Sequence, residues 1–204
     1  MAAYETSVFL NVPFDRPYKK LLNALVFGVH DCGLLSRCAL EADDGGQVRL
    51  DKLYTIIKEC RFGIHDLSRT TLDGIHRLPR FNMPLELGVF LGAREYGRGE
   101  QKRKSLLILD RAPYRYQVFC SDIAGQDIRA HDNDAERALT AIRNWLQAAV
   151  SVEYLPSPAK LRRRYLEFRR QLPFMCEEED LTPSELTFLD YRWLVDAWVE
   201  VNPR

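Results

Sequence analysis

Short apolar runs alternate with longer segments of helical periodicity along the first 150 residues of the chain. The runs are rich in strand-forming side chains and end at turn-forming residues, which is typical of buried strands. The predicted strands are Ser7 to Val12, Leu34 to Leu40, Phe62 to Ser68, Ser105 to Asp110 and Asp127 to His131. Between them, apolar residues recur three or four positions apart, which predicts helices. These helices are expected from Asp15 or Arg16 to near Gly33, from Leu50 to Cys60, from Asn82 to about Tyr96 and from Asn133 to Val150.

Strands that alternate with helices predict an α/β fold, in which a parallel sheet is covered by helices on both faces. Right-handed crossovers then give a three-layer, flavodoxin-like or Rossmann-like arrangement of about five strands. We therefore expect one α/β domain at residues 1–152.

The last 52 residues have a different pattern and are expected to form a C-terminal helical extension at residues 153–204. Pro156-Ser157-Pro158 marks the boundary, and a basic helix (159–172) and an aromatic-rich helix (183–201) follow. We interpret the arginines of the first helix as a charged face packed against the acidic run at 177–180. The second helix has more apolar residues than one face needs, so part of it is expected to contact another copy or a partner protein. These residues are Leu186, Phe188, Leu189, Tyr191, Trp193, Leu194 and Trp198.

Composition narrows the functional class. The net charge is zero, which argues against nucleic acid as a partner because such proteins usually carry a basic excess. The five cysteines are widely spaced without a C-x-x-C pair, and the four histidines form no metal-binding motif, so we expect a reducing cytoplasm and no metal. No signal peptide and no apolar run long enough to span a membrane are evident.

The candidate chemistry lies at the carboxyl ends of the predicted strands, where open parallel sheets bind their ligands. Three segments reach this edge: 11–15 after the first strand, 66–68 after the third and 110–111 after the fourth. A residue in the first turns of the following helix reaches it too. Glu86 is such a residue, one turn after Asn82, which is a good N-cap.

Two interpretations of Glu86 are open. Its neighbours in the helix are nearly all apolar, and a carboxylate in a buried helix must be paired, desolvated or placed at a cavity. The alternative is a glutamate that complements the helix dipole or pairs with an arginine. Asp66 likewise has a common structural role as an Asx-turn or cap residue. His65 points away from Asp66 along the strand, and we favour a core histidine.

Other motifs point away from the best-known nucleotide sites. The loop Asp43-Asp44-Gly45-Gly46 is consistent with a metal or ribose site, although a solvated turn is the commoner use of such residues. The chain has no G-x-G-x-x-G, no Walker A and no G-x-S-x-G motif.

Three motifs resemble one family. They are V-F-L-N-V-P-F-D at 8–15, H-D-L-S at 65–68 and N-M-P-L-E-L-G-V-F-L-G-A at 82–93. With them, about residues 7 to 110 resemble the nucleoside 2-deoxyribosyltransferase-like and Toll/interleukin-receptor-like (TIR-like) group. That group has a strand-end aspartate followed by a glutamate in an E-L-G-x-A-like helix.

The resemblance implies cleavage of an N-glycosidic bond in a nucleoside, a nucleotide or NAD, with NAD as substrate and no resident cofactor. It implies Glu86 as the catalytic carboxylate and Asp66 and Asn82 as supporting groups. Residues at 11–15 would line the base or ribose pocket. The predicted catalytic residues are thus Glu86 and Asp66, and the predicted substrate-binding residues are Asn11, Pro13, Phe14, Asp15, Ser68 and Asn82.

Three functions remain open on this basis. The first is an NAD or nucleotide N-glycosidase, a type of TIR-like protein that often serves bacteria as an NAD-depleting effector of anti-phage defence. The second is a nucleoside 2-deoxyribosyltransferase. The third is a sensor or scaffold that binds a nucleotide without cleaving it, or that assembles through the C-terminal helices.

Overall fold

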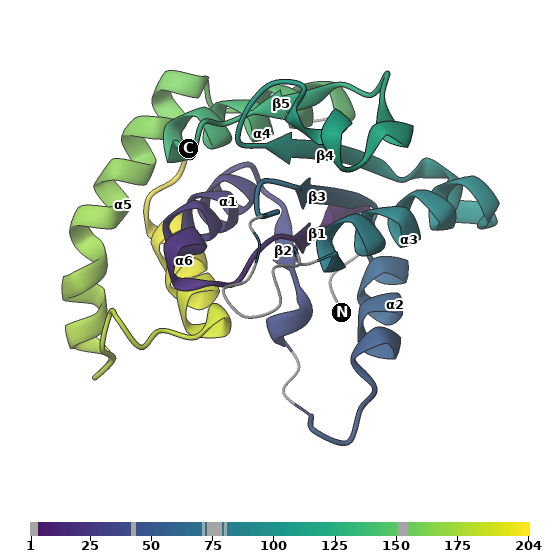
Figure 1. Ribbon diagram of the computed structural model, residues 1–204. Coiled ribbons are helices and arrows are strands. Elements are labelled where there is room, and N and C mark those ends of the chain that lie inside the picture. Colours follow the sequence, from purple (N-terminus) through teal and green to yellow (C-terminus); the bar gives the residue numbers. More distant parts are fainter. Residues whose placement is uncertain (1–3, 42–43, 71, 73–78, 80, 151–154) are drawn as a thin grey trace.

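The computed structural model describes residues 4–41, 44–70, 72, 79, 81–150 and 155–204. Its centre is a five-stranded, fully parallel sheet with the strand order β2-β1-β3-β4-β5 (Figure 1). The strands are β1 (Ser7–Asn11), β2 (Leu35–Arg37), β3 (Phe62–Asp66), β4 (Ser105–Asp110) and β5 (Ile128–Ala130). The predicted α/β fold is confirmed, and the strand order is the flavodoxin-like one.

Helices cover both faces of the sheet (Figure 1). One face carries α1 (Lys19–Asp31), α4 (Ala135–Ala149), α5 (Pro158–Glu178) and α6 (Phe188–Val201), and the other carries α2 (Arg49–Glu59) and α3 (Asn82–Tyr96). Short 3₁₀ helices lie in the connections. They are η1 (Tyr4–Thr6), η2 (Arg16–Tyr18), η3 (Ala39–Glu41), η4 (Gly99–Arg103), η5 (Arg115–Val118) and η6 (Ser121–Ile123).

Several element boundaries differ from those expected. The second strand is shorter than predicted, because the chain turns into η3 two residues after Arg37. The fifth helix is longer, since it continues through Pro173 to Glu178. The sixth begins only at Phe188, where Thr187 and Asp190 form a capping box. Asn82 is not the N-cap of α3 but its first residue, and Phe81 occupies the cap position without a side-chain hydrogen bond.

The two C-terminal helices pack against α1, the central helix of their face (Figure 1). The Phe27 ring of α1 lies 5.3 Å from the rings of Tyr165 and Phe168 and 5.7 Å from that of Trp198. Most of the predicted aromatic stripe is therefore buried within the chain. Only Leu189 and Trp193 remain exposed, at 41% and 49% of their surface. The proposed boundary near 152 falls at 151–154, outside the described residues.

The interpretation of the α5 arginines was wrong, because in the described structure none of their ion pairs reaches the acidic run at 177–180. Arg164 instead forms a two-pronged pair with Asp31, whose carboxylate is fully buried. Arg164 also donates to the carbonyl of Asn202. This pair fastens α5 and the end of the chain to α1. None of the helices in the described part of the chain combines the length and apolar character that a bilayer span requires.

Gly63 allows a close approach between β3 and α3. A Cβ atom at this position would lie 2.7 Å from Nε2 of His65 and 2.8 Å from Cζ of Phe90, two rings without exposed surface. Gly88, in contrast, lies on the exposed side of α3 with nothing within 4 Å of an added Cβ.

We therefore expect opposite effects from the same substitution at these two glycines. Gly63→Ala should lower the free energy of unfolding by about 2 kcal/mol because the added methyl group overpacks a rigid aromatic contact. Gly88→Ala should raise it by about 0.5 to 1 kcal/mol, since alanine has the higher helix propensity. Urea titration followed by circular dichroism measures both, and equal effects would contradict the packing around Gly63.

Candidate functional site

Buried polar side chains gather at the carboxyl ends of the strands. Asn11 ends β1, Asp66 ends β3, Asp110 ends β4, and His131 directly follows β5. All four expose 1% of their surface or less. Burying polar groups is costly unless they are hydrogen-bonded, so their partners define what each of them can do.

Asp66 is the centre of a closed hydrogen-bond cluster on the α1 side of the sheet. Its Oδ2 accepts hydrogen bonds from the Tyr18 hydroxyl and, at 2.9 Å, from Nε2 of His131, and its Oδ1 accepts from the backbone N–H of Ser68 at 2.7 Å. Burial alone would raise the pKa of Asp66, but hydrogen bonds from His131, Ser68 and Tyr18 outweigh it and lower the pKa. Asp66 is therefore an ionised carboxylate without exposed surface.

The tautomer of His131 follows from its two contacts. Its Nδ1 accepts a hydrogen bond from the backbone N–H of Asn133 at 2.9 Å, so Nε2 carries the proton and donates it to Asp66. Asp132 and Asn133 both have left-handed backbone angles, with φ of 50° and 57°. Non-glycine residues adopt this conformation rarely, and the turn therefore serves to present the Asn133 N–H to His131.

Arg115 joins the loops that follow β3 and β4. Its guanidinium donates two hydrogen bonds to Oδ1 of Asp110, at 2.8 and 2.5 Å, and others to the Leu67 carbonyl and the Thr70 hydroxyl. Oδ2 of Asp110 is buried without a partner in the described structure. Burial raises the pKa of Asp110, and Arg115 opposes that rise. The Asp110 carboxylate thus serves to hold Arg115, which joins the two loops, and is not directed at a ligand.

A second group of polar side chains lies on the opposite, α2–α3 face. The Asn11 amide donates to Nδ1 of His65 at 2.9 Å and to the backbone carbonyl of Met83, in the first turn of α3, at 2.8 Å. Burial lowers the pKa of His65 to about 3, so this ring is neutral, and it packs edge-on against Phe9 and Phe90. His65 is a core histidine on the face opposite to Asp66, as strand alternation requires. The side-chain amide oxygen of Asn11, Oδ1, is buried without a hydrogen-bond partner among the described residues.

Glu86 lies in this same region, on the second turn of α3. Only 6% of its surface is exposed, and no described residue forms a hydrogen bond or ion pair with its carboxylate. Burial raises the pKa of Glu86 to about 7, and the positive charge of Arg49, at the start of α2, opposes the rise. Glu86 is therefore a desolvated carboxylate that changes its charge near neutral pH, a property common among catalytic acids and bases.

A large cavity opens beyond β1 and β2, between the starts of α1, α2 and α6. We call it the α1–α2–α6 cavity, and its volume is about 1080 Å³. Phe14 and Asp15 line it from the loop after β1, and Arg49 from α2. The α6 side contributes Pro183, Ser184, Leu186, Thr187, Phe188, Leu189 and Tyr191. Asp15 also forms an ion pair with Arg69, at 3.0 Å, which connects the loops after β1 and β3. The start of α6 and the segment before it thus form one wall of a cavity at the ligand edge of the sheet.

The structure divides the predicted site residues into separate groups. Phe14 and Asp15 line the cavity, and Asn11 contacts the helix that carries Glu86. Asp66 belongs to the closed cluster on the other face, together with the backbone of Ser68.

The other two predicted residues, Pro13 and Asn82, differ in burial. Pro13 is buried, whereas Asn82 is exposed at the start of α3. The hydroxyl of Ser68 is buried without a hydrogen-bond partner in the part of the chain that the structure describes. Within the acidic loop, Asp43 lies outside the described residues, as does most of the segment between Ser68 and Phe81.

Sequence reasoning missed Tyr18, His131, Arg115 and Arg49. His131 ends the predicted fifth strand, so the rule that selected Asp66 and Asp110 would have selected it too. The other three lie on helices, and their partners come from distant segments of the chain. No local pattern identifies them.

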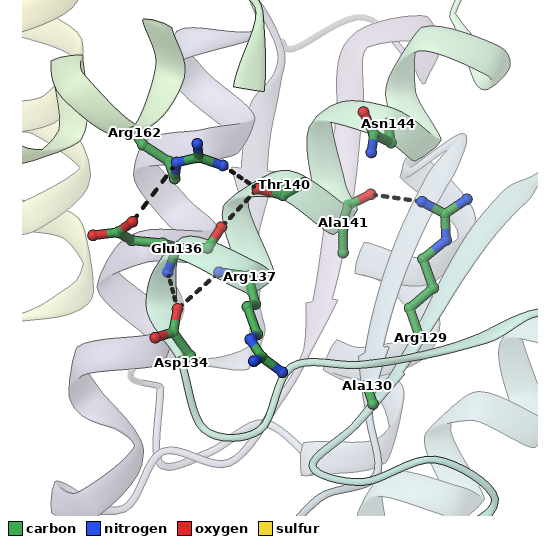
Figure 2. Close-up of a pocket in the computed structure, with 9 residues that line it drawn as sticks. All are labelled: Arg129, Ala130, Asp134, Glu136, Arg137, Thr140, Ala141, Asn144 and Arg162. Carbon is green, nitrogen blue, oxygen red and sulfur yellow. Dashed lines mark hydrogen bonds and ion pairs between the residues drawn. The ribbon is translucent and has the colours of Figure 1, made fainter. Parts of the chain in front are cut away.

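A second groove lies at the flank of β5 and α4. Three arginines line it (Figure 2). Arg129 donates to the Ala141 carbonyl, Arg162 contacts Glu136 and Thr140, and Arg137 forms an ion pair with Asp132. All three guanidinium groups thus already have partners within the protein, and two of those partners are carboxylates, so the groove is a poor candidate for a ligand site.

Comparison with known proteins adds no family assignment. No model of a known protein family matches the chain, and no curated protein matches its sequence. The site must therefore be judged from its own residues.

Proposed function

We propose that this protein cleaves an N-glycosidic bond of NAD or a related nucleotide, with Glu86 as its catalytic carboxylate. The observation that supports this proposal is the buried Glu86 side chain, which has no hydrogen-bond or ion-pair partner among the described residues. Burying such a group destabilises the fold, so its presence indicates that function requires it. Its position near the ligand edge of a parallel sheet is where a substrate is expected.

The reaction needs a carboxylate of this kind. Breaking the bond between the ribose C1′ and nicotinamide leaves the electron pair on the nicotinamide nitrogen and positive charge on the sugar. Ionised Glu86 would stabilise that charge, or would attack C1′ to form a covalent ester, as glycosidases do. Water then supplies a hydroxyl group to C1′ and releases a proton, so the products are nicotinamide and ADP-ribose. An apolar surround strengthens the attraction by lowering the local dielectric.

We assign Asp66 a positioning role in this proposal. Its carboxylate accepts three hydrogen bonds and has no exposed surface, so it is poorly placed to touch a substrate. It holds the loop after β3 and the turn after β5 in place at the ligand edge.

Mass spectrometry of reaction products tests the proposal most directly. The full-length protein is incubated at high concentration with NAD, with other nucleotides, and with a deoxynucleoside plus a free base. Nicotinamide together with ADP-ribose supports the proposed hydrolysis. An exchanged nucleoside would instead identify a deoxyribosyltransferase, and saturable binding without any product would identify a sensor or scaffold.

The pH dependence of hydrolysis provides a second test. Because the ionised form of Glu86 is the reactive one and its pKa is about 7, kcat/KM should rise by about tenfold between pH 6 and pH 8 and then level off. A rate that falls over this range would mean that protonated Glu86 is the active form. That result would favour a neutral purine leaving group, which needs a proton donor.

A further inference from the structure

We infer that the α1–α2–α6 cavity binds the phosphate groups of a nucleotide, with Arg16 and Arg49 as the phosphate contacts. The inference rests on the proposed function only in that it places the phosphate end of the same substrate. It also selects the substrate class, since a phosphorylated dinucleotide can use these contacts and a free deoxynucleoside cannot.

The charge of the cavity lining supports an anionic ligand. Four basic side chains line it, and the only acidic ones in the described lining are Asp15 and Glu41. Both acids pair with arginines that lie outside the lining. Asp15 contacts Arg69 at 3.0 Å, and Glu41 contacts Arg37 at 2.5 Å and Arg192 at 3.1 Å. The basic side chains therefore dominate the field inside the cavity. They are Arg16, Lys19, Arg49 and Lys52.

Two of these basic groups are available to a ligand. Within the described structure, the guanidinium groups of Arg16 and Arg49 form no hydrogen bond and no ion pair, and both side chains are exposed. Arginine is well suited to phosphate because it presents several N–H donors in a planar fork. The arginines in the groove of Figure 2 are different, since each is already bonded within the protein.

The neighbouring residues position these two groups. Arg16 begins η2, and Tyr18 at the end of that turn donates to the buried Asp66 carboxylate, which fixes the turn that carries Arg16. Across the cavity, Lys19 donates to the backbone carbonyls of Ser184 and Leu186, which holds the α6 wall in place. The site is therefore built from η2, α1 and α2 on one side and from the start of α6 and the segment before it on the other.

Arg49 connects the cavity with Glu86. It lines the cavity, and its charge acts on the carboxylate of Glu86, which is not itself among the lining residues. A phosphate bound by Arg49 would direct the ribose end of the same molecule toward Glu86. The volume of about 1080 Å³ leaves room for a whole dinucleotide, since it lies just above the roughly 300 to 1,000 Å³ typical of small-molecule sites. Phe14 and the exposed aliphatic side chains Leu40 and Leu189 offer apolar surface to a base.

Isothermal titration calorimetry at low salt tests the inference with ADP, adenosine and inorganic pyrophosphate. We expect ADP to bind at least about tenfold more tightly than adenosine, and pyrophosphate to compete with ADP. Arg16→Ala and Arg49→Ala should each weaken ADP binding by about tenfold or more, as loss of a charged hydrogen bond would. Neither substitution should change the affinity for adenosine by more than about twofold.

Arg137→Ala is the matched control, since it removes an arginine from the second groove and should leave ADP binding unchanged. Equal affinity for ADP and adenosine, or ADP binding that is insensitive to both Arg16→Ala and Arg49→Ala, would overturn the inference. Thermal unfolding of each variant confirms that it is folded.

The two proposals fail in distinguishable ways. ADP has no nicotinamide bond to cleave, so its binding is measured independently of turnover. ADP binding that depends on Arg16 and Arg49, without cleavage of any substrate, would support the cavity assignment and refute the glycosidase. If the protein cleaves NAD but its ADP binding is unchanged by both arginine substitutions, the glycosidase is supported and the cavity assignment is refuted.

Discussion

Replacing Glu86 by glutamine is expected to lower NAD hydrolysis by about 100-fold or more and, at the same time, to make the folded protein more stable at pH 8. The loss of activity follows from removing the negative charge that would face the developing positive charge on the ribose. The gain in stability follows from removing a buried charge that has no partner among the described residues.

The pH dependence of this gain has a definite sign. Burial raises the pKa of Glu86 from its ordinary value of 4.5 to about 7, so the folded state binds the proton more tightly than the unfolded state does. The wild-type protein therefore loses stability as pH rises from about 4.5 through 7, by on the order of 2 to 3 kcal/mol. Glu86→Gln has no such loss, so its advantage should be full at pH 8 and absent at pH 4.5.

Urea unfolding at these two pH values, combined with the product assay at pH 8, measures both effects. Glu95→Gln provides the control, because Glu95 is an exposed carboxylate on the same helix and should change neither quantity. A Glu86→Gln protein with wild-type turnover would refute the proposed mechanism. One that is less stable than wild type at pH 8 would mean that Glu86 has a stabilising partner.

Replacing Asp66 by asparagine is expected to cost about 3 kcal/mol or more of folding free energy. The amide can still accept from the Ser68 N–H, but its NH₂ group would then face the donor Nε2 of His131 and the Tyr18 hydroxyl. His131 cannot exchange its tautomer freely, because Nδ1 accepts from Asn133. A hydrogen bond to a charged group typically contributes about 1.5 to 3 kcal/mol, and two of them would be lost.

At acid pH, the wild-type protein should no longer have a higher free energy of unfolding than the Asp66→Asn variant. The pKa of Asp66 is lowered in the folded state, so its contribution is complete above the unfolded value near 3.8 and is lost as pH falls through the lower folded value. Urea titrations at pH 7 and in acid measure the difference. Glu167→Ala is the comparison, since Glu167 belongs to an exposed ion pair with Arg170 and should cost less than about 1 kcal/mol. A loss of similar size in both variants would contradict the role of the Asp66 cluster.

How well each part of the fold could be predicted depends on whether its cause is visible in the apolar pattern of the sequence or lies in particular hydrogen bonds. Alternating apolar runs were sufficient for the parallel sheet, because burial on both faces leaves a continuous apolar signal in strands such as β4. Exact ends were harder: the η3 turn shortened β2, and the Thr187 capping box delayed α6, and both depend on local hydrogen bonds.

The site was less predictable than the fold. The burial of Glu86 could be anticipated from its apolar neighbours on α3, since a helix apolar on most sides is a buried one. The partner of Asp66 could not, because His131 lies 65 residues away and only the sheet order brings the two together. The basic cavity could not be predicted either, since its arginines come from η2 and α2 and its far wall from the last 25 residues.

The position of α1 has a consequence for anyone who wishes to excise or fuse this domain. Ten of its thirteen residues are buried, with the sheet on one side and α4, α5 and α6 on the others. A fragment ending after residue 150 would leave Phe27 and its neighbours in water, and such a fragment would be prone to aggregate. Fusion partners are better attached beyond Arg204 or before the first strand, with the whole chain kept as one folding unit.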